Sequence, residues 1–328
     1  MIRRKLLAGT AAAIALPLSF TQSVFAQAAG KVSRVIVPFP AGGGTDAVAR
    51  LTAEKLRADY PAGIIVDNRA GASGRLGSEY VRDSEADGST MLFTPDFVMT
   101  IFPYSFRKLS YNPLQDFAPV ALASKTGYAL VAGPSLPASV TNLQQFVAWA
   151  KANPKQASFA STSAGSASHF TGIMLSRAIN TELLHVPYKG GALALQDLMG
   201  GQIPVSINPI GEVLPHLKSG RVRVLATMGA QRSRFVPDAP TLVESGLKDM
   251  VIESWLGFFM PAKTPPATIA KASAAINAVL QRQDIKDGYA GIAMDTVQST
   301  PASFAAVIKA DQERWAPIVK ASGFTAED

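Results

Sequence analysis

Short apolar runs alternate with helical patterns along this chain, and the alternation limits the possible folds more than any other feature. Residues 35–37 form an apolar run, residues 47–60 fit an amphipathic helix, and residues 64–66 are apolar again. A glycine-rich stretch, a further helical pattern and the run TMLFTP complete the series. A βαβαβ order implies parallel strands covered by helices, so we predict an α/β fold.

A second series of the same kind follows. Its helical patterns cover residues 143–152, 169–180 and 192–199, and its strand-like runs are ASFAST, ELLHVPY, IPVSINP and VRVLATM. Two helical patterns, at residues 269–281 and 304–320, come after Pro265 and Pro266. A chain of this length exceeds what one compact core usually holds, which favours two domains.

Two long apolar runs, residues 120–132 and 251–260, separate the two series and suit extended strands. The simplest arrangement has two lobes, with the chain crossing between them at these runs. We predict one lobe from residues 27–125 together with 251–328, and the other from residues 126–250. A cleft between lobes is a preferred place for a ligand.

The first 26 residues are typical of a secretory signal peptide. Basic residues at positions 3–5 precede an apolar run over residues 6–20, and Val24-Phe25-Ala26 fits a cleavage site after Ala26. The run is shorter than the roughly 20 residues that a membrane span needs, and it contains Pro17. We expect export to the periplasm, and the sequence leaves the general and twin-arginine routes open.

Composition excludes several classes of function. The formal charge of +7 falls to +4 when the three basic residues of the signal are removed, and no Lys/Arg cluster suggests nucleic acid. The absence of cysteine excludes disulfides, thiolate metal sites and cysteine nucleophiles. Neither H-E-x-x-H, G-x-G-x-x-G nor a P-loop is present, so we expect no metal and no cofactor.

The loop VPFPAGGGTDAVAR lies between a predicted strand and a predicted helix. Glycines there let an anion approach the unpaired N–H groups and partial positive charge of a helix N-terminus. Thr45 or Asp46 could cap that helix. A carboxylate suits such a loop, and a tight turn with a cap is the alternative.

Two further loops have the same character. STSAGSASHF supplies hydroxyls before a helix, with His169 in the first turn either donating to a ligand or packed in the structure. HVPYKGGALALQDLMGG places two glycines before a helix, beside Tyr188 and Lys189; Asp197 suits a structural role. Three helix N-termini could thus converge on one cleft.

The chain resembles the Bug family, the extracytoplasmic solute receptors of tripartite tricarboxylate transporters. The resemblance rests on VPFPAGGGTDAVAR, DNRAGASGRLGSEYV, HVPYKGGALALQDLMGGQI, RVRVLATMGAQRSRFVPDAPTLVESG and WLGFFMPAKTP, in this order. It implies a two-lobed, periplasmic-binding-protein-like fold of the Venus flytrap type. It also implies a small organic acid as the ligand, such as a mono-, di- or aromatic carboxylate or an acidic amino acid.

The resemblance also implies which residues form the site. One carboxylate would be held by backbone groups and water from the first and third loops, at Phe39, Gly43, Gly44, Thr45 and Asp46 and at Tyr188, Gly190 and Gly191. The second-lobe wall would include Ser163, Gly165, Ser166 and His169, with Asn208 as a further candidate. Thr94 lies at a strand end where ligand identity would be set.

We therefore predict a non-enzymatic periplasmic receptor that captures a small carboxylate for a tripartite transporter. The expected partners are membrane permease subunits, and the receptor itself is expected to be a monomer. Backbone N–H groups rather than a dedicated arginine would bind the carboxylate, with Arg69 and Arg75 as competing candidates. An exported hydrolase or lyase is the alternative, although no histidine lies in a nucleophile–base motif. A sensory module would need the same two lobes.

Overall fold

The computed structural model describes residues 31–326. The predicted signal peptide, residues 1–26, lies outside them. Within residues 31–326, ten strands form one sheet, whose main path runs β2-β1-β3-β9-β4-β7-β5-β6. The strands are β1 Ser33–Val37, β2 Ile64–Asn68, β3 Thr90–Pro95, β4 Phe117–Ala132, β5 Ser158–Ser161, β6 Leu184–Pro187, β7 Val205–Pro209, β8 Arg223–Thr227, β9 Glu253–Pro261 and β10 Asp295–Thr296.

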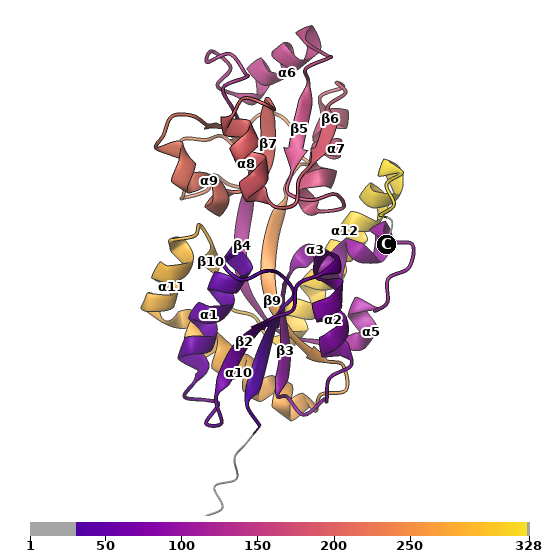
Figure 1. The fold of residues 1–328 in the computed structure, drawn as a ribbon, viewed down its shortest axis with the longest axis vertical. Helices are drawn as coiled ribbons and strands as arrows, with labels where there is room; N and C mark the ends of the chain where they lie inside the picture. Colours follow the sequence, from indigo (N-terminus) through magenta and orange to yellow (C-terminus); the bar gives the residue numbers. More distant parts are fainter. Residues whose placement is uncertain (1–30, 327–328) are drawn as a thin grey trace, which may run out of the picture. The chain divides into compact units, whose positions relative to one another are not determined.

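Helices follow most of the strands in the chain (Figure 1). They are α1 Gly44–Leu56, α2 Arg75–Arg82, α3 Asp96–Thr100, α4 Phe102–Ser105, α5 Pro113–Asp116, α6 Leu143–Ala152, α7 Ala167–Ala178, α8 Gly191–Met199, α9 Ile210–Leu217, α10 Pro266–Gln281, α11 Gln283–Ala290 and α12 Pro301–Ser322, with a 3₁₀ turn at Ala72–Gly74. The predicted α/β fold is confirmed, and the predicted helix at residues 143–152 has the bounds of α6.

Two sets of parallel strands meet in this sheet. In the N-terminal part of the sheet, β1 pairs in parallel with β2 and β3. In the central part, β5 pairs in parallel with β6 and β7. The loops that leave β1, β5 and β6 lead directly into α1, α7 and α8, as the sequence predicted. Loops at the carboxyl ends of parallel strands are the usual ligand-binding side of such sheets.

Strand β4 joins the two parts of the sheet. Its first residues, from Phe117 to Gly127, pair antiparallel with β9, and its last residues, from Tyr128 to Ala132, pair with β7. Strand β8 also pairs with the end of β4, and β10 pairs with Ser124 and Lys125. Figure 1 shows β4 and β9 running alongside each other from one part to the other. The two predicted long strands are therefore confirmed.

Apolar side chains pack on both parts of the sheet. One cluster joins Val35, Phe93 and Phe258 in the N-terminal part. Another is built around Phe159 and Phe170 in the central part, and it includes Trp315 of α12. Helix α12 therefore contributes to the core of the central part, although most of its other contacts lie with β4 and α3.

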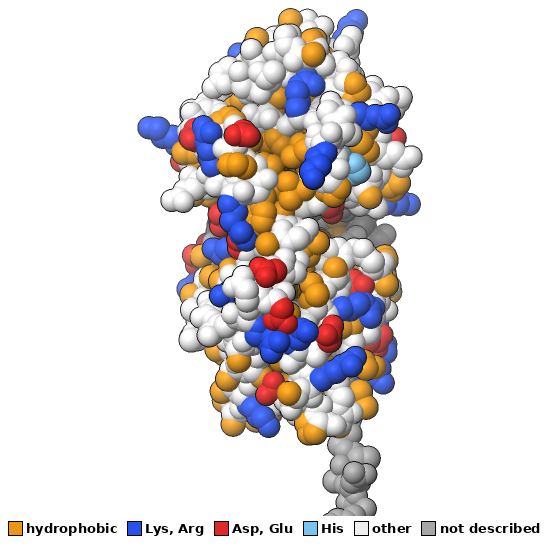
Figure 2. All heavy atoms as spheres, turned by 90° about the vertical axis from the view of Figure 1, so that its left-hand side faces the viewer, with side chains coloured by type: hydrophobic (Ala, Val, Ile, Leu, Met, Phe, Trp, Pro, Cys, Tyr) orange, Lys and Arg blue, Asp and Glu red, His pale blue; other side chains and the backbone are white. Residues whose placement is uncertain are grey.

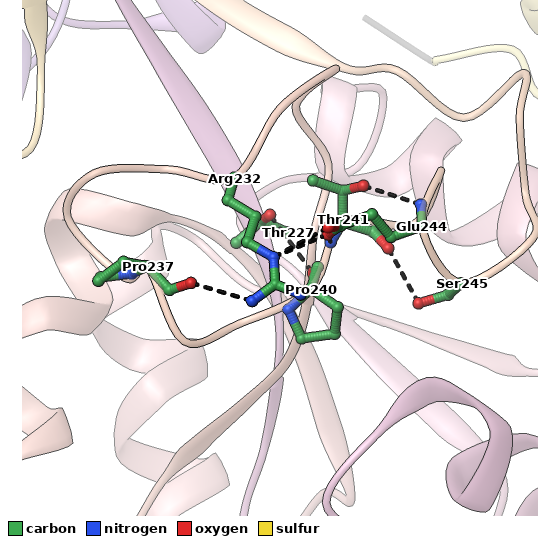
Figure 3. A network of polar contacts seen from close by, with 7 residues as sticks. All are labelled: Thr227, Arg232, Pro237, Pro240, Thr241, Glu244 and Ser245. Atoms are coloured by element: carbon green, nitrogen blue, oxygen red, sulfur yellow. Dashed lines mark hydrogen bonds and ion pairs between the residues drawn. The ribbon is translucent and has the colours of Figure 1, made fainter.

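The connection from β8 to β9 has no long element of its own but is held by side chains (Figure 3). Arg232 Nε lies 3.0 Å from both carboxylate oxygens of Glu244. Glu244 also accepts from the Thr241 N–H at 2.7 Å, and Thr241 Oγ1 accepts from the Glu244 N–H at 2.9 Å. The Thr227 N–H donates to Pro240 O at 2.8 Å. These bonds fix the path by which the chain returns to β9.

Candidate ligand site

A cavity of about 620 Å³ lies where the three glycine-containing loops meet β4 and β9. In Figure 2, hydrophobic side chains gather where this face of the molecule is hollowed. The cavity is lined by Phe39, Pro40, Gly42, Gly43, Gly44, Thr45, Ala47, Ser73, Pro95, Phe97, Thr126, Tyr128, Thr162, Ser163, Ser166, Tyr188, Lys189, Gly190, Gly191, Pro209, Gly211, Glu212, Ser254, Leu256, Ile292 and Met294.

The N-terminus of α1 opens onto this cavity without a side-chain cap. Gly43 is the N-cap residue, and no side chain accepts from the first turn. The first intrahelical bond runs from the Ala47 N–H to Gly43 O, so the N–H groups of Gly44 and Thr45 have no intrahelical partner. The expectation that Thr45 or Asp46 caps this helix is wrong.

Asp46 instead fixes the loop that precedes α1. Its Oδ2 accepts from the Gly42 N–H at 2.9 Å and from Arg50 Nε at 3.0 Å, and its Oδ1 accepts from Asn68 Nδ2 at 2.9 Å. Burial opposes ionisation of this carboxyl, but the bonds from Arg50, Gly42 and Asn68 outweigh it and lower the pKa. Gly42 has φ +89°, a conformation that favours glycine.

The N-terminus of α8 lies on the opposite side of the cavity and also lacks a side-chain cap. Gly190 has φ +119°, and its N–H donates to Thr162 O at 2.8 Å. A Cβ on Gly191 would lie 1.6 Å from Glu212 Oε2 and 2.5 Å from Asn208 Nδ2. Only glycine therefore fits at residue 191 with Glu212 in this position.

The third helix terminus, that of α7, is satisfied within the protein. Ser166 is its N-cap residue, and Ser166 Oγ accepts from the His169 N–H at 3.4 Å. Ser166 Oγ also donates to Ser163 O at 2.6 Å. Of the three helix termini that the sequence predicts at the cleft, two therefore present N–H groups without side-chain caps.

His169 is packed inside the protein, which was one of its two predicted roles. It is 4% exposed, and its Nδ1 accepts from the Gly165 N–H at 3.1 Å. Its ring stacks on His185 with centroids 3.8 Å apart. Burial lowers the pKa of both histidines to about 4, and for His169 the neighbouring His185 adds to the effect.

Ser161 and His185 form a hydrogen-bonded pair, with Oγ and Nε2 2.7 Å apart. Ser161 is fully buried and does not line the cavity, and its hydroxyl donates to Ser163 O at 3.1 Å. A nucleophile must reach its substrate, so this pair has the geometry of a structural contact.

The predicted site residues divide into two sets. Nine line the cavity: Phe39, Gly43, Gly44, Thr45, Ser163, Ser166, Tyr188, Gly190 and Gly191. Five lie behind the wall: Asp46, Thr94, Gly165, His169 and Asn208. Asn208 supports the wall, because its Nδ2 donates to Gly191 O and Glu212 Oε2, each at 3.2 Å. Tyr188 donates its hydroxyl to Asp197 at 2.8 Å, which gives Asp197 the predicted structural role.

Sequence reasoning missed the part of the wall that the long strands supply. Thr126 and Tyr128 come from β4, and Ser254 and Leu256 from β9. Glu212, on α9, was also missed. Part of this wall could have been found from the sequence by one signal. Thr126 and Ser254 are polar residues within otherwise apolar strands, at the places where the chain was predicted to cross between lobes.

Few charges line the cavity. Among the described residues that form its wall, Lys189 is the cation and Glu212 the anion, and no arginine is present. Arg69 instead donates to Asp67 at 3.1 Å and lies over the Tyr80 ring, and Arg75 lies over the Phe106 ring. Neither competing arginine lines the cavity.

Within residues 31–326, no group of three or more histidine, aspartate or glutamate side chains is arranged to hold a metal ion. Every helix in this range is too short or too polar to cross a membrane.

Comparison with known proteins agrees with these features. Residues 48–324 match the model of the tripartite tricarboxylate transporter family receptor. Protein BugT of Bordetella pertussis is 32% identical over 291 residues, which are 88% of this chain and 89% of that protein.

Two solved structures are similar in fold and sequence. The periplasmic binding protein BugD is 28% identical, with a TM-score of 0.79 over 90% of this chain and 98% of that one. The Rhodopseudomonas palustris protein Rpa4515 with adipate is 27% identical, with a TM-score of 0.82 over the same shares of the two chains. The resemblance read from the sequence is thereby confirmed, and this chain belongs to the tripartite tricarboxylate transporter receptor family, with Bug proteins among its relatives.

Proposed function

We propose that this chain is a periplasmic receptor that binds a small carboxylate and passes it to membrane permease subunits. The observation that carries the proposal is the uncapped N-terminus of α1, which faces a cavity without arginine. Its N–H groups and partial positive charge suit an anion. The solved structure of the similar Rpa4515 protein with adipate supports a carboxylate of this size.

The binding energy required is modest. A micromolar receptor needs about −8 kcal/mol. Hydrogen bonds to a charged group contribute roughly 1.5–3 kcal/mol each, so two or three of them supply much of this energy after the cost of association. The apolar wall around Phe97, Leu256 and Met294 adds burial of the rest of the ligand.

We further propose that binding closes two lobes over the ligand. The lobes are residues 27–125 with 251–328, and residues 126–250. Strands β4 and β9 connect the lobes and contribute residues to the cavity wall, and Trp315 of α12 also packs against the core of the second lobe. A ligand that contacts both lobes favours the closed state by its difference in affinity for the two states. No catalysis is needed for this function, and a monomer can carry it out.

A carboxylate panel with matched neutral analogues tests the proposal. Hexanoate, benzoate and adipate are compared with hexanamide, benzamide and adipamide by calorimetry and thermal shift. At least one carboxylate is expected to bind, and at 100 times its Kd it should stabilise the protein by about 2.7 kcal/mol. Equal binding of the amides, no binding of any carboxylate, or turnover of a bound acid would contradict the proposal.

Residue 44 offers a matched pair of variants. Gly44→Pro removes one N–H at the first helical position, where proline is well tolerated, and Gly43 before it already has extended backbone (φ −78°, ψ 168°). Gly44→Ala keeps that N–H, and its Cβ would meet only Met294 Cε, at 3.7 Å. Proline is expected to weaken carboxylate binding by about tenfold or more, and alanine by less than about threefold.

A further inference from the structure

Glu212 and Asp46 are both acidic residues near an uncapped helix terminus at the cavity. The charge of Asp46 has a cationic partner, and within the part of the chain that the structure describes the charge of Glu212 does not. Asp46 is paired with Arg50 at 3.0 Å and lies behind the wall. Glu212 lies in the wall itself. Among the described residues it contacts the neutral amide of Asn208 and forms no ion pair. Glu212 is exposed to solvent, and its unpaired charge lies at the wall that a ligand would contact.

The position of Glu212 concerns α8 in particular. The contact that excludes any side chain at Gly191 places Glu212 Oε2 against the first residue of α8. A carboxylate there offsets the partial positive charge of that helix terminus. The N-terminus of α1 is thus left as the better of the two sites for a ligand carboxylate.

The remaining wall offers little compensation for a second negative charge. Lys189 is exposed, and no other cation lines the cavity among the described residues. Phe97, Leu256 and Met294 are apolar. A second carboxylate on the ligand would lose water with the exposed Lys189 as its only cationic partner in the described wall, and it would face Glu212.

We propose, on the basis of the receptor function above, that Glu212 determines specificity by excluding dicarboxylates. The ligand is then a compound with a single carboxylate and an otherwise uncharged body, with any hydrogen-bond donor turned toward Glu212. Partial desolvation raises the pKa of the Glu212 carboxyl although the residue is exposed to solvent, which agrees with a site where a negative charge lacks a partner. Adipate, the compound in the Rpa4515 structure, belongs to the excluded class.

Adipate and its monoamide test this inference, because they match in length and differ by one negative charge and one donor. Calorimetry at pH 7.5 is expected to give at least about tenfold tighter binding for the adipate monoamide than for adipate. The succinate monoamide is likewise expected to bind more tightly than succinate. Hexanoate and benzoate report whether the receptor binds carboxylates at all.

Glu212→Gln removes the charge and keeps an acceptor for Asn208. This variant is expected to bind adipate at least about tenfold more tightly than wild type and to change hexanoate binding by less than about threefold. Glu313→Gln, an exposed glutamate on α12, is the control and should match wild type. Circular dichroism and the melting temperature establish that each variant is folded.

The outcomes are distinguishable. If hexanoate or benzoate binds but adipate binds as tightly as its monoamide, or Glu212→Gln leaves their ratio unchanged, the inference about Glu212 is wrong and the receptor function stands. If no carboxylate binds, both the receptor function and this inference fail.

Discussion

The stability of the protein is expected to fall between pH 7.5 and pH 5 because His169 and His185 resist protonation in the folded state. Replacing both histidines by glutamine should make this fall much smaller. Ser161 Oγ donates to Ser163 O, so it accepts from His185 Nε2, which must carry the proton. His169 Nδ1 accepts from the Gly165 N–H. Protonation of Nδ1 would therefore break this hydrogen bond and leave two N–H donors facing each other. Two imidazolium rings stacked at 3.8 Å would also repel.

The magnitude follows from the change in pKa on folding. Both histidines have a pKa near 4 in the folded protein, against 6.5 for an ordinary histidine. The unfolded chain therefore binds more protons between these values, and stability falls as the pH drops through the window. At pH 5 the loss is about 2 kcal/mol for each histidine and about 4 kcal/mol for the pair, relative to pH 7.5.

Urea unfolding of wild type and of His169→Gln/His185→Gln at both pH values provides the measurement. The variant is expected to be less stable at pH 7.5, because it loses the stacked contact, but to lose about 4 kcal/mol less than wild type on acidification. Single variants separate the two rings. Parallel pH dependences for wild type and the double variant would show that the histidines are not neutral and buried as described.

Three further predictions concern other buried contacts. Asp96 accepts from Ser254 Oγ at 2.7 Å, and burial raises its pKa to about 7, so its stabilising effect grows as the pH falls. Asp96 should give the wild-type protein about 2 kcal/mol of added stability between pH 7.5 and pH 5, and Asp96→Asn should lack this gain. If urea unfolding of the variant shows the same pH dependence as wild type, the prediction is wrong. Asp46→Ala leaves three donors without their acceptor and should cost about 3 kcal/mol by denaturant unfolding; a change under about 0.5 kcal/mol would contradict the role given to this carboxylate. A Cβ on Gly257 would lie 2.3 Å from Phe304 Cζ, so Gly257→Ala should cost about 1–3 kcal/mol, and an unchanged melting temperature would count against the tight packing.

The alternation of apolar runs and helical patterns was sufficient to predict most of the fold. Long elements such as α6 carry enough periodic residues to fix both type and bounds. Helices α3 and α4, of five and four residues, are too short to show a period. Helix α9 contains Pro215, which reads as a helix breaker in sequence.

The site was predictable where it depends on local chemistry. Glycines at strand–helix junctions placed Gly43, Gly44, Gly190 and Gly191 at the cavity wall. The position of Glu212 in the wall was not predictable, because it depends on the contact of α9 with the first residue of α8. Such contacts between separate elements leave no periodic signal along the chain.

In the proposed receptor, backbone N–H groups of α1 bind the ligand carboxylate. A crystal structure with 4-bromobenzoate tests it most directly, because the bromine can be located independently by its anomalous scattering. We predict carboxylate oxygens at about 3 Å from the backbone nitrogens of Gly44 and Thr45, with bromine toward the apolar wall at Leu256. A carboxylate bound to Lys189, with the α1 terminus facing only water, would contradict the claim.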